Sequence, residues 1–374
     1  MDTGVFEYIK WRGDLSFKVS AFNEIDALIF CELSYLHLKG IVPSDFSSKG
    51  IPLHKVVELF FSAEDYSSRS DTGLFFNKNL LDLLKAVGEV PRYKDVSLIG
   101  FVESTDLVQE KQFAAFTTKL DDGSFFVAYR GTDDSIIGWK EDFNMVFVTP
   151  VPAQTEALNY LIQASKLKGK IRIGGHSKGG NLSVYAATYC PSSIQKRIIE
   201  VYNNDGPGFE YNITELKEFR PICDKVHTFV PQDSIVGMLL EHDEDYVIVQ
   251  SVENGLMQHD PFSWQVCGTN FILLDKVSKQ SVFIDHAIKD WLKGMDKDHR
   301  EQFVDALYDL LTSSEASTFS ELSEKWTKNP IAAVRSLLAL NEETRSIVWN
   351  SIQQLFRSAR TQIPSITDLF NKQT

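Results

Sequence analysis

The sequence predicts an α/β fold with a mostly parallel central sheet, a helical segment before it and a helical extension after it. Strand-like runs alternate with helical patterns in the middle of the chain, and such alternation builds a parallel sheet with helices on both faces. Apolar residues recur at helical spacing before Pro91 and again after about residue 281. We therefore divide the chain into a segment packed on the core at 1–90, the core at 91–280 and the extension at 281–374.

Three helices are expected in the N-terminal segment, because apolar residues recur there at the spacing of one helix face. These stretches are residues 21–38, 53–61 and 80–87. Between the last two, the tract SRSDTGL at residues 67–73 is polar and contains glycine. We expect a loop there.

The predicted core begins with three β-rich runs, at residues 96–104, 111–120 and 124–131. The turn sequence Asp121-Asp122-Gly123 joins the last two, so these runs are expected to be antiparallel neighbours. A helix near Pro152, the strand KIRIGG, a second helix and two further strand-like runs follow. Those last runs, at residues 196–205 and 224–232, each end in a loop with an acidic residue.

Composition narrows the classes of partner and compartment. The formal net charge of −13 opposes binding to nucleic acid or to an anionic membrane surface, since either needs a basic footprint. The four cysteines lack CxxC pairing and zinc spacing, which speaks against a disulfide framework and a structural metal. No run reaches the roughly 18 apolar residues of a membrane span, and no secretory leader pattern is visible. We expect a cytoplasmic protein without cofactor, nucleic acid partner or integral membrane association.

The segment KIRIGGHSKGGNLSVYAA, residues 170–187, contains GHSKG, which fits the G-x-S-x-G pattern of a nucleophile elbow. An elbow needs an entering strand, a sharp turn with a strained serine, and a leaving helix, with glycines where a side chain would collide. Here KIRIGG enters, Gly175 and Gly179 flank Ser177, and a helix leaves from Gly180 onward. We predict that Ser177 is the nucleophile, with the Lys178 N–H and the helix dipole aimed at the developing oxyanion.

A nucleophilic serine needs a base, which in such hydrolases follows the acid in the chain. His259, in a loop between strand-like segments, is the preferred base. His227 lies inside a strand, His242 in the charge-rich EHDEDY, and His286 on an amphipathic helix.

Two aspartates at strand ends are candidates for the acid that orients the histidine. Asp233, in TFVPQDSIVG, follows a strand expected one position further across the sheet and precedes His259, so we take it as the acid. Asp205, in YNNDGPGF, stands before glycine, where aspartate usually anchors a turn.

At these residues the chain resembles the α/β-hydrolase superfamily and, within it, the class 3 (fungal-type) lipases. A second motif carries the resemblance, FFVAYRGTDDSIIGWKEDF, with Arg130, Gly131, Thr132, Trp139 and Asp142. The resemblance spans about residues 95–275 and implies an α/β-hydrolase fold in which Thr132 supplies the second oxyanion donor. The whole chain is similar to a bacterial lipase-like family of unknown function. The secretory signal and disulfides of the lipases are missing, which argues against extracellular triglyceride digestion.

The leading expectation is a serine hydrolase that cleaves carboxylic esters through an acyl-enzyme, using Ser177, His259 and Asp233 with oxyanion donors at Thr132 and Lys178. A non-catalytic binding protein of the same fold is the alternative from another class. Thioester or amide cleavage by the same triad is a third. The stretch IVGMLL, residues 235–240, is either a flap that lines an acyl site, favouring short to medium chains, or an ordinary buried helical turn.

Overall fold

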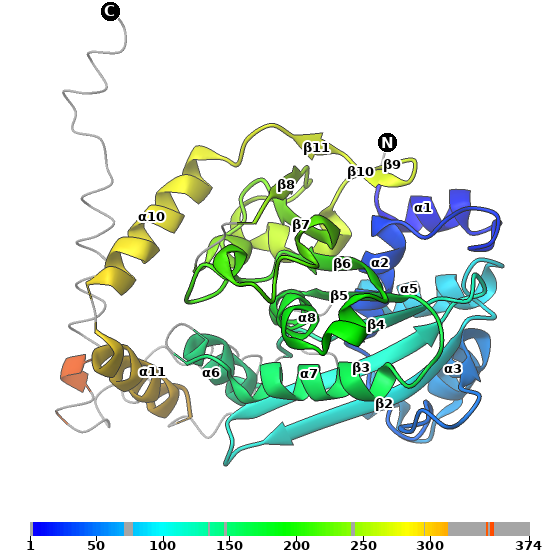
Figure 1. Cartoon of the computed structure of the whole chain (residues 1–374), viewed down its shortest axis with the longest axis horizontal. Helices are drawn as coiled ribbons and strands as arrows, with labels where there is room; N and C mark the ends of the chain where they lie inside the picture. The colour runs from blue at the N-terminus through cyan, green and yellow to red at the C-terminus, as the bar shows by residue number, and fades with distance from the viewer. Residues whose placement is uncertain are drawn as a thin grey trace, which may run out of the picture.

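A nine-stranded sheet forms the centre of the computed structural model (Figure 1), with strand order β1-β2-β3-β4-β5-β6-β7-β8-β11. The structure describes residues 3–70, 78–133, 135–145, 148–240, 244–294, 296–312, 342 and 345–347. The strands of this sheet are β1 (Ile51–Pro52), β2 (Ser97–Asp106), β3 (Lys111–Lys119), β4 (Phe125–Tyr129), β5 (Ile171–His176), β6 (Ile198–Asn204), β7 (Val226–Pro231), β8 (Tyr246–Val249) and β11 (Leu273–Leu274). A separate hairpin pairs β9 (Val266–Cys267) with β10 (Asn270–Phe271).

Parallel pairing is confined to the middle of the sheet, from β4 to β8. Antiparallel strands flank it on both sides: β1, β2, β3 and β4 pair in sequence, and β11 pairs with β8. The fold is therefore a mixed α/β fold. The carboxyl ends of β5, β6 and β7 lie next to one another, so residues that follow these strands meet at one edge of the sheet.

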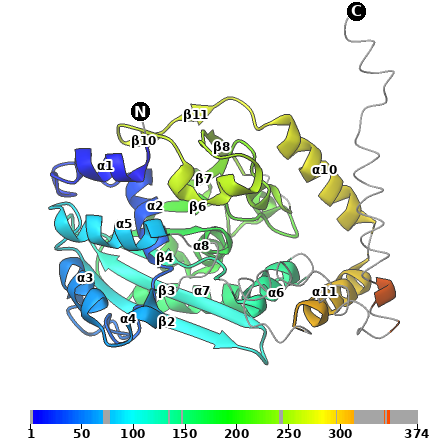
Figure 2. The same ribbon diagram turned by 180° about the vertical axis from the view of Figure 1, so that it is seen from behind.

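The N-terminal helices cover one face of the sheet, and Figure 2 shows the molecule from that side. These are α1 (Val5–Arg12), α2 (Glu24–Leu33), α3 (Leu53–Ser62), α4 (Tyr66–Arg69) and α5 (Lys78–Glu89). Phe22 and Phe30 pack their rings on Phe126 of β4, which joins this helical layer to the sheet. The loop expected at 67–73 is corrected in part, because Tyr66–Arg69 forms the short helix α4, while 71–73 lie outside the described residues.

A buried ion pair ties this N-terminal layer together. Asp26 accepts hydrogen bonds from Arg92 Nε at 2.8 Å and Arg92 Nη2 at 2.5 Å, and both side chains are fully buried. The remaining guanidinium hydrogens go to the carbonyl oxygens of Leu15, Ser20 and Ala21. Every N–H of the Arg92 guanidinium group therefore has an acceptor, and the pair lies in the helical layer formed by the N-terminal segment.

The other face of the sheet carries α7 (Pro152–Ala164) and α8 (Lys178–Tyr189), which stand in front of it in Figure 1. Leu161 and Leu182 from these helices share a core with Val127 and Ile173, whereas the neighbouring Phe126 faces the N-terminal helices. This alternation is the period of two that a strand with two covered faces requires. Two shorter helices complete this side, α6 (Ile136–Asn144) and α9 (Ser192–Gln195).

The C-terminal region contains α10 (Lys279–Lys293) and α11 (Lys297–Thr312), which lie on the same side of the molecule in Figure 1, with α11 next to α6. Leu311 packs on Ile136 of α6, and Lys140 Nζ reaches Asp305 at 2.9 Å. The helices expected beyond α11 lie almost entirely outside the described residues. Within the described part of the chain, no helix combines the length and apolarity needed to cross a membrane.

Candidate active site

Ser177 occupies a sharp turn between β5 and α8, with φ 57° and ψ −133°. A positive φ is strained for a residue with a side chain and marks sites whose backbone is held for a purpose. The turn closes because Gly175 and Gly179 lack side chains: a Cβ at Gly175 would lie 2.1 Å from the Gly179 carbonyl carbon. The helix begins at Lys178, two residues earlier than predicted. As the first helical residue, Lys178 has an N–H without an intrahelical acceptor.

His259 lies near the turn and pairs with Asp205. Its Nδ1 is 2.6 Å from Asp205 Oδ2, and its ring centroid is 4.5 Å from that of His176, the residue before Ser177. Asp205 follows β6 directly and has a side chain only 1% exposed. Its other oxygen accepts from Ser234 Oγ at 2.5 Å and from Gly237 N at 3.1 Å, so both oxygens of this carboxylate accept hydrogen bonds.

The prediction that Asp233 orients His259 is corrected by these contacts. Asp233 Oδ2 instead accepts from Gly255 N and from Gln258 Nε2, both at 3.0 Å. Its own N–H donates to Gln258 Oε1 at 2.8 Å. Asp233 therefore holds the backbone of the loop that carries His259, while Asp205 holds the ring.

The other histidines weighed from the sequence do not join this site. His227 is exposed on β7, and His286 is exposed on α10. His242 lies outside the described residues.

The loop after β4 lies against the serine turn. A Cβ on Gly131 would stand 3.0 Å from Ser177 Cβ and 2.6 Å from the His176 carbonyl oxygen, so only glycine allows this approach. The next residue, Thr132, is buried, and its hydroxyl donates to Asp142 Oδ2 at 2.5 Å. Thr132 and Lys178 thus flank Ser177 from two different segments of the chain.

His176 was not singled out from the sequence, although it stands inside the GHSKG motif. It is buried, and its Nε2 donates to the His259 carbonyl oxygen at 2.9 Å. The Tyr35 hydroxyl donates to Nδ1 at 3.0 Å, since a neutral ring that donates through one nitrogen accepts through the other. Burial, and next the charge of His259, lower the pKa of His176 well below its usual range. His176 is therefore a neutral support for the His259 backbone.

Two carboxyl groups border the site, the buried Glu32 and the partly exposed Asp142. Glu32 Oε1 lies 3.6 Å from His176 Nδ1, and burial raises the pKa of Glu32 well above its usual range. Burial also raises the pKa of Asp142, to about 6, against the opposing influence of Lys178 and of the Thr132 hydroxyl. In both cases removal from water disfavours the charged form of the carboxyl group.

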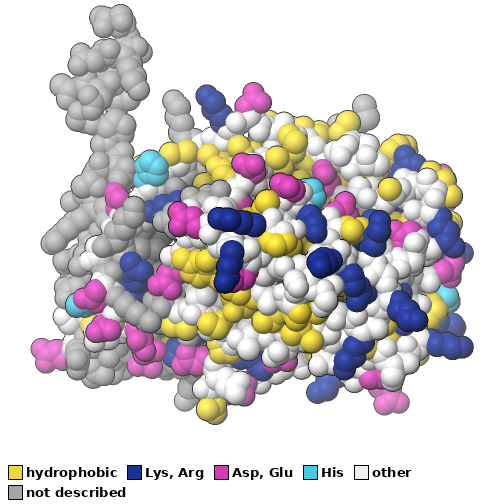
Figure 3. All heavy atoms as spheres, viewed as in Figure 1, with side chains coloured by type: hydrophobic (Ala, Val, Ile, Leu, Met, Phe, Trp, Pro, Cys, Tyr) yellow, Lys and Arg dark blue, Asp and Glu magenta, His cyan; other side chains and the backbone are white. Residues whose placement is uncertain are grey.

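No metal centre and no disulfide accompany the site in the described part of the chain. All four cysteines are free, with Cys31 and Cys190 buried and Cys223 and Cys267 exposed. The described residues include no cluster of three or more potential ligands. On the face seen in Figure 3, basic side chains are interspersed with acidic and apolar ones.

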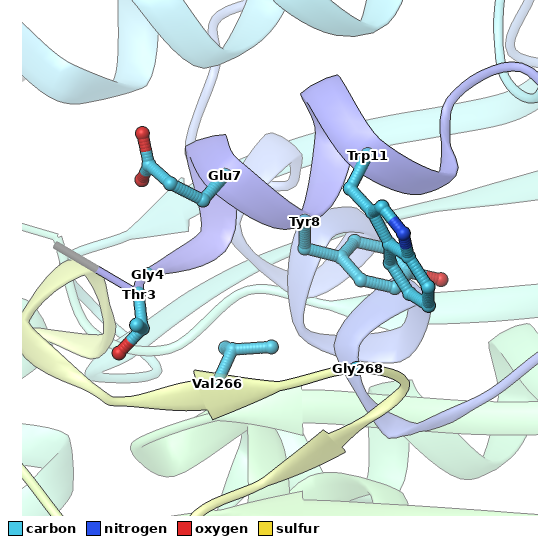
Figure 4. Close-up of a pocket in the computed structure, with 7 residues that line it drawn as sticks. All are labelled: Thr3, Gly4, Glu7, Tyr8, Trp11, Val266 and Gly268. Carbon is cyan, nitrogen blue, oxygen red and sulfur yellow. The ribbon is translucent and has the colours of Figure 1, made fainter. Parts of the chain in front are cut away.

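A small cavity of about 140 Å³ lies elsewhere, between α1 and the β9–β10 hairpin. Figure 4 shows its lining, with Tyr8 and Trp11 from α1 and Val266 and Gly268 from the hairpin. None of the candidate site residues borders it.

Comparison with known proteins adds a family to this geometry. The Mbeg1-like family model matches residues 87–309, a range that includes Thr132, Ser177, Asp205 and His259. This family is lipase-like and related to the class 3 lipases, which confirms the resemblance stated from the sequence. Among solved structures, the chain is similar to M37 lipase, with 16% identity over 57% of this chain and 67% of that one, at a TM-score of 0.35. No curated protein matches the chain.

Proposed function

The chain belongs to the Mbeg1-like family, and from this premise we propose that it is a serine hydrolase of the α/β-hydrolase type that cleaves carboxylic esters. The observation that carries the proposal is the pairing of His259 Nδ1 with the buried Asp205 at 2.6 Å, beside a serine at φ 57°. A strained serine, a histidine and a buried carboxylate are the three parts of a nucleophilic acyl-transfer site. Asp205 takes the role of the acid in place of Asp233.

In this mechanism His259 acts as the base. An ionised carboxylate only accepts hydrogen bonds, so the contact with Asp205 keeps the hydrogen of His259 on Nδ1 and leaves Nε2 unprotonated. Nε2 takes the Ser177 hydroxyl proton as Oγ attacks the ester carbonyl carbon. The C–O bond to the leaving alcohol then breaks, and the imidazolium returns its proton to that alcohol. Water attacks the acyl-enzyme by the same route and releases the carboxylic acid.

The negative charge on the carbonyl oxygen in each tetrahedral intermediate needs donors that are already in position. We assign this role to the N–H groups of Lys178 and Thr132. The start of α8 supplies the first, together with the positive end of the helix dipole. The contact of Gly131 with the serine turn supports the second, because it brings the Thr132 segment to Ser177.

We further propose that short to medium acyl chains are preferred over acetate. The stretch 235–240 includes a 3₁₀ turn, Val236–Met238, whose Gly237 N–H donates to Asp205 Oδ1. Ile235 and Val236 beside it are half-buried. Apolar groups next to the catalytic carboxylate suit an acyl chain, since each buried methylene adds about 0.8 kcal/mol of binding.

A fluorophosphonate probe followed by peptide mapping tests the proposal. The probe forms a covalent bond only with an activated serine, so we expect one labelled peptide containing Ser177. A series of nitrophenyl esters from acetate upward then reports the acyl preference. An unlabelled, folded protein would favour the alternative of a non-catalytic binding protein. Labelling without ester turnover would favour thioesters or amides as substrates.

A further inference from the structure

The residue that follows the proposed nucleophile is a buried lysine. Lys178 is 1% exposed, and its ammonium group donates to Glu141 Oε2 at 3.0 Å, to Gln112 Oε1 at 2.8 Å and to the Gln112 carbonyl oxygen at 3.1 Å. These three bonds use all three hydrogens of the ammonium group. The side chain thus runs from the serine turn to α6, which carries Glu141, and to β3, which carries Gln112.

Glu141 connects this lysine to two further elements. It is fully buried, and its Oε2 also accepts from Gln112 N at 3.0 Å. Its Oε1 accepts from Ala153 N, in the first turn of α7, at 2.8 Å. One carboxylate therefore joins β3, α7 and the serine turn to α6.

The next residue on α6, Asp142, contacts Thr132 on the other side of the site. Asp142 accepts the Thr132 hydroxyl at 2.5 Å, and its Oδ1 lies 3.8 Å from Lys178 Nζ. The position of Thr132 relative to Ser177 thus depends on where α6 sits. A helix of nine residues has little stability of its own, so its position is set by tertiary contacts such as the one between Glu141 and Lys178.

We propose that Lys178 is a positioning residue that acts on both halves of the oxyanion site. Its main chain supplies one donor at the start of α8, and its ammonium group, through Glu141, holds α6 so that Thr132 presents the other. This inference rests on the proposed function. A buried ion pair contributes little net stability compared with apolar side chains of similar size, so its main effect here is on geometry.

The test is a paired variant, Lys178→Met with Glu141→Gln. It removes both charges, whereas either single substitution would leave the partner's charge buried without its counter-ion. We expect kcat on a nitrophenyl ester to fall about 10- to 100-fold, less than the roughly 10²- to 10³-fold cost of removing an oxyanion donor because the donor is displaced rather than lost, with KM changed by less than about threefold. Fluorophosphonate labelling of Ser177 should slow in parallel, because that reaction uses the same donors. Amide hydrogen exchange over 136–144 should become faster.

The matched control is a second fully buried ion pair, Asp26 with Arg92. The variant Arg92→Met with Asp26→Asn removes two charges from the N-terminal helical layer. We expect it to lower the melting temperature, because Met cannot donate to the carbonyl oxygens of Leu15, Ser20 and Ala21 that Arg92 binds, while kcat stays within about threefold of the wild type. A comparable loss of kcat in this control would mean that the effect of the Lys178 variant reflects general destabilisation.

A second variant keeps the inference testable if the paired variant does not fold. Thr132→Val removes the bond to Asp142 and keeps the side-chain volume and the backbone N–H, and kcat should fall about tenfold at unchanged KM. In the Thr132→Val background, the Lys178 and Glu141 changes should lower kcat by less than about threefold more, because they act through the same donor. An unchanged kcat in either variant, or fully additive losses, would overturn the inference. The two proposals fail in different ways. If the wild-type protein neither reacts with the probe nor turns over esters, the proposed function fails. If the wild type is active and the variants are unaffected, only the inference about Lys178 fails.

Discussion

Asp205 and Asp233 follow neighbouring strands of the sheet and both serve the loop of His259, but in different ways. Asp205 is almost fully buried and holds the imidazole ring through Nδ1. Asp233 is partly exposed and holds the loop backbone through Gly255 N and the side chain of Gln258. Two aspartates at adjacent strand ends thus have different roles: Asp205 orients the imidazole ring, and Asp233 fixes the backbone of the loop.

The two carboxylates are also linked to each other. Ser234, directly after Asp233, donates its hydroxyl to Asp205 at 2.5 Å. A substitution at either aspartate can therefore disturb the other. Rates must be compared together with stability to separate the two roles.

The Ser177→Ala variant gives the lowest turnover expected, with which the turnover of both aspartate variants is compared. We expect turnover of a nitrophenyl ester to fall by about 10⁴- to 10⁶-fold, because the hydroxyl carries the chemistry. The melting temperature should not fall, since the turn depends on its glycines. Turnover that persists at about a tenth of the wild-type rate would remove Ser177 from the mechanism.

Asp205→Asn should give the second largest effect, a loss of about 10⁴-fold in kcat. The amide can donate to Nδ1, which moves the imidazole hydrogen to Nε2 and leaves no base for Ser177. Steady-state kinetics of the folded variant measure this loss. A small loss here combined with a large one in Asp233→Asn would reverse the comparison and restore Asp233 as the acid.

Asp233→Asn should act mainly on stability. Both accepted hydrogen bonds go to Oδ2, so the amide oxygen can keep both, but a neutral acceptor binds each donor less strongly than a carboxylate. We therefore expect kcat to fall less than about fivefold and the free energy of unfolding to drop by about 1–2 kcal/mol. Urea unfolding at neutral pH gives the second number. Because Gln258 is buried between Asp233 and the loop, Gln258→Leu is the matched control and should lower stability in the same way.

His176, which donates a hydrogen bond to the His259 carbonyl oxygen, can be tested through the pH dependence of stability. Its folded-state pKa is depressed, so below about pH 6.5 the unfolded chain binds a proton that the folded chain does not. The free energy of unfolding should therefore fall with pH below about 6.5, by up to about 1.4 kcal/mol per pH unit from this residue. In His176→Gln that contribution disappears. Urea titrations at about pH 7.5 and about pH 5.5 should show a smaller difference in the variant, and an equal difference would contradict a neutral His176.

The serine turn could be predicted from the sequence because its requirements are local. A strand, flanking glycines and a helix follow one another around Ser177, and the structure has the same order with the helix two residues earlier. The parallel strands β5 to β7 and the helices α2, α3 and α5 were likewise visible as periodic apolar residues. The short helix α4 was not, since four polar and aromatic residues show no helical period.

The acid could not be predicted, because the choice depends on how the His259 loop folds back over the sheet. Asp205 precedes a glycine and has φ 52°, which is the usual signature of a turn, but its side chain binds His259, and it is Asn203 Oδ1 that accepts the N–H of Gly206 in that turn. The supports Tyr35 and His176 come together across 141 positions of the chain, and nothing in the local pattern of either residue indicates the other. Long-range pairing of this kind leaves no periodic signal.

The left-handed backbone of Ser177 and Asp205 has a consequence for how this protein can adapt to heat. Two adjacent strand ends each hold a residue with a side chain at positive φ, at about 1–3 kcal/mol apiece, in a fold whose total stability is on the order of 5–15 kcal/mol. Glycine would relieve the strain at either position and remove the proposed chemistry with it. Greater thermal resistance must therefore come from elsewhere in the chain, and an inactive Ser177→Gly protein should melt at a higher temperature than the active one.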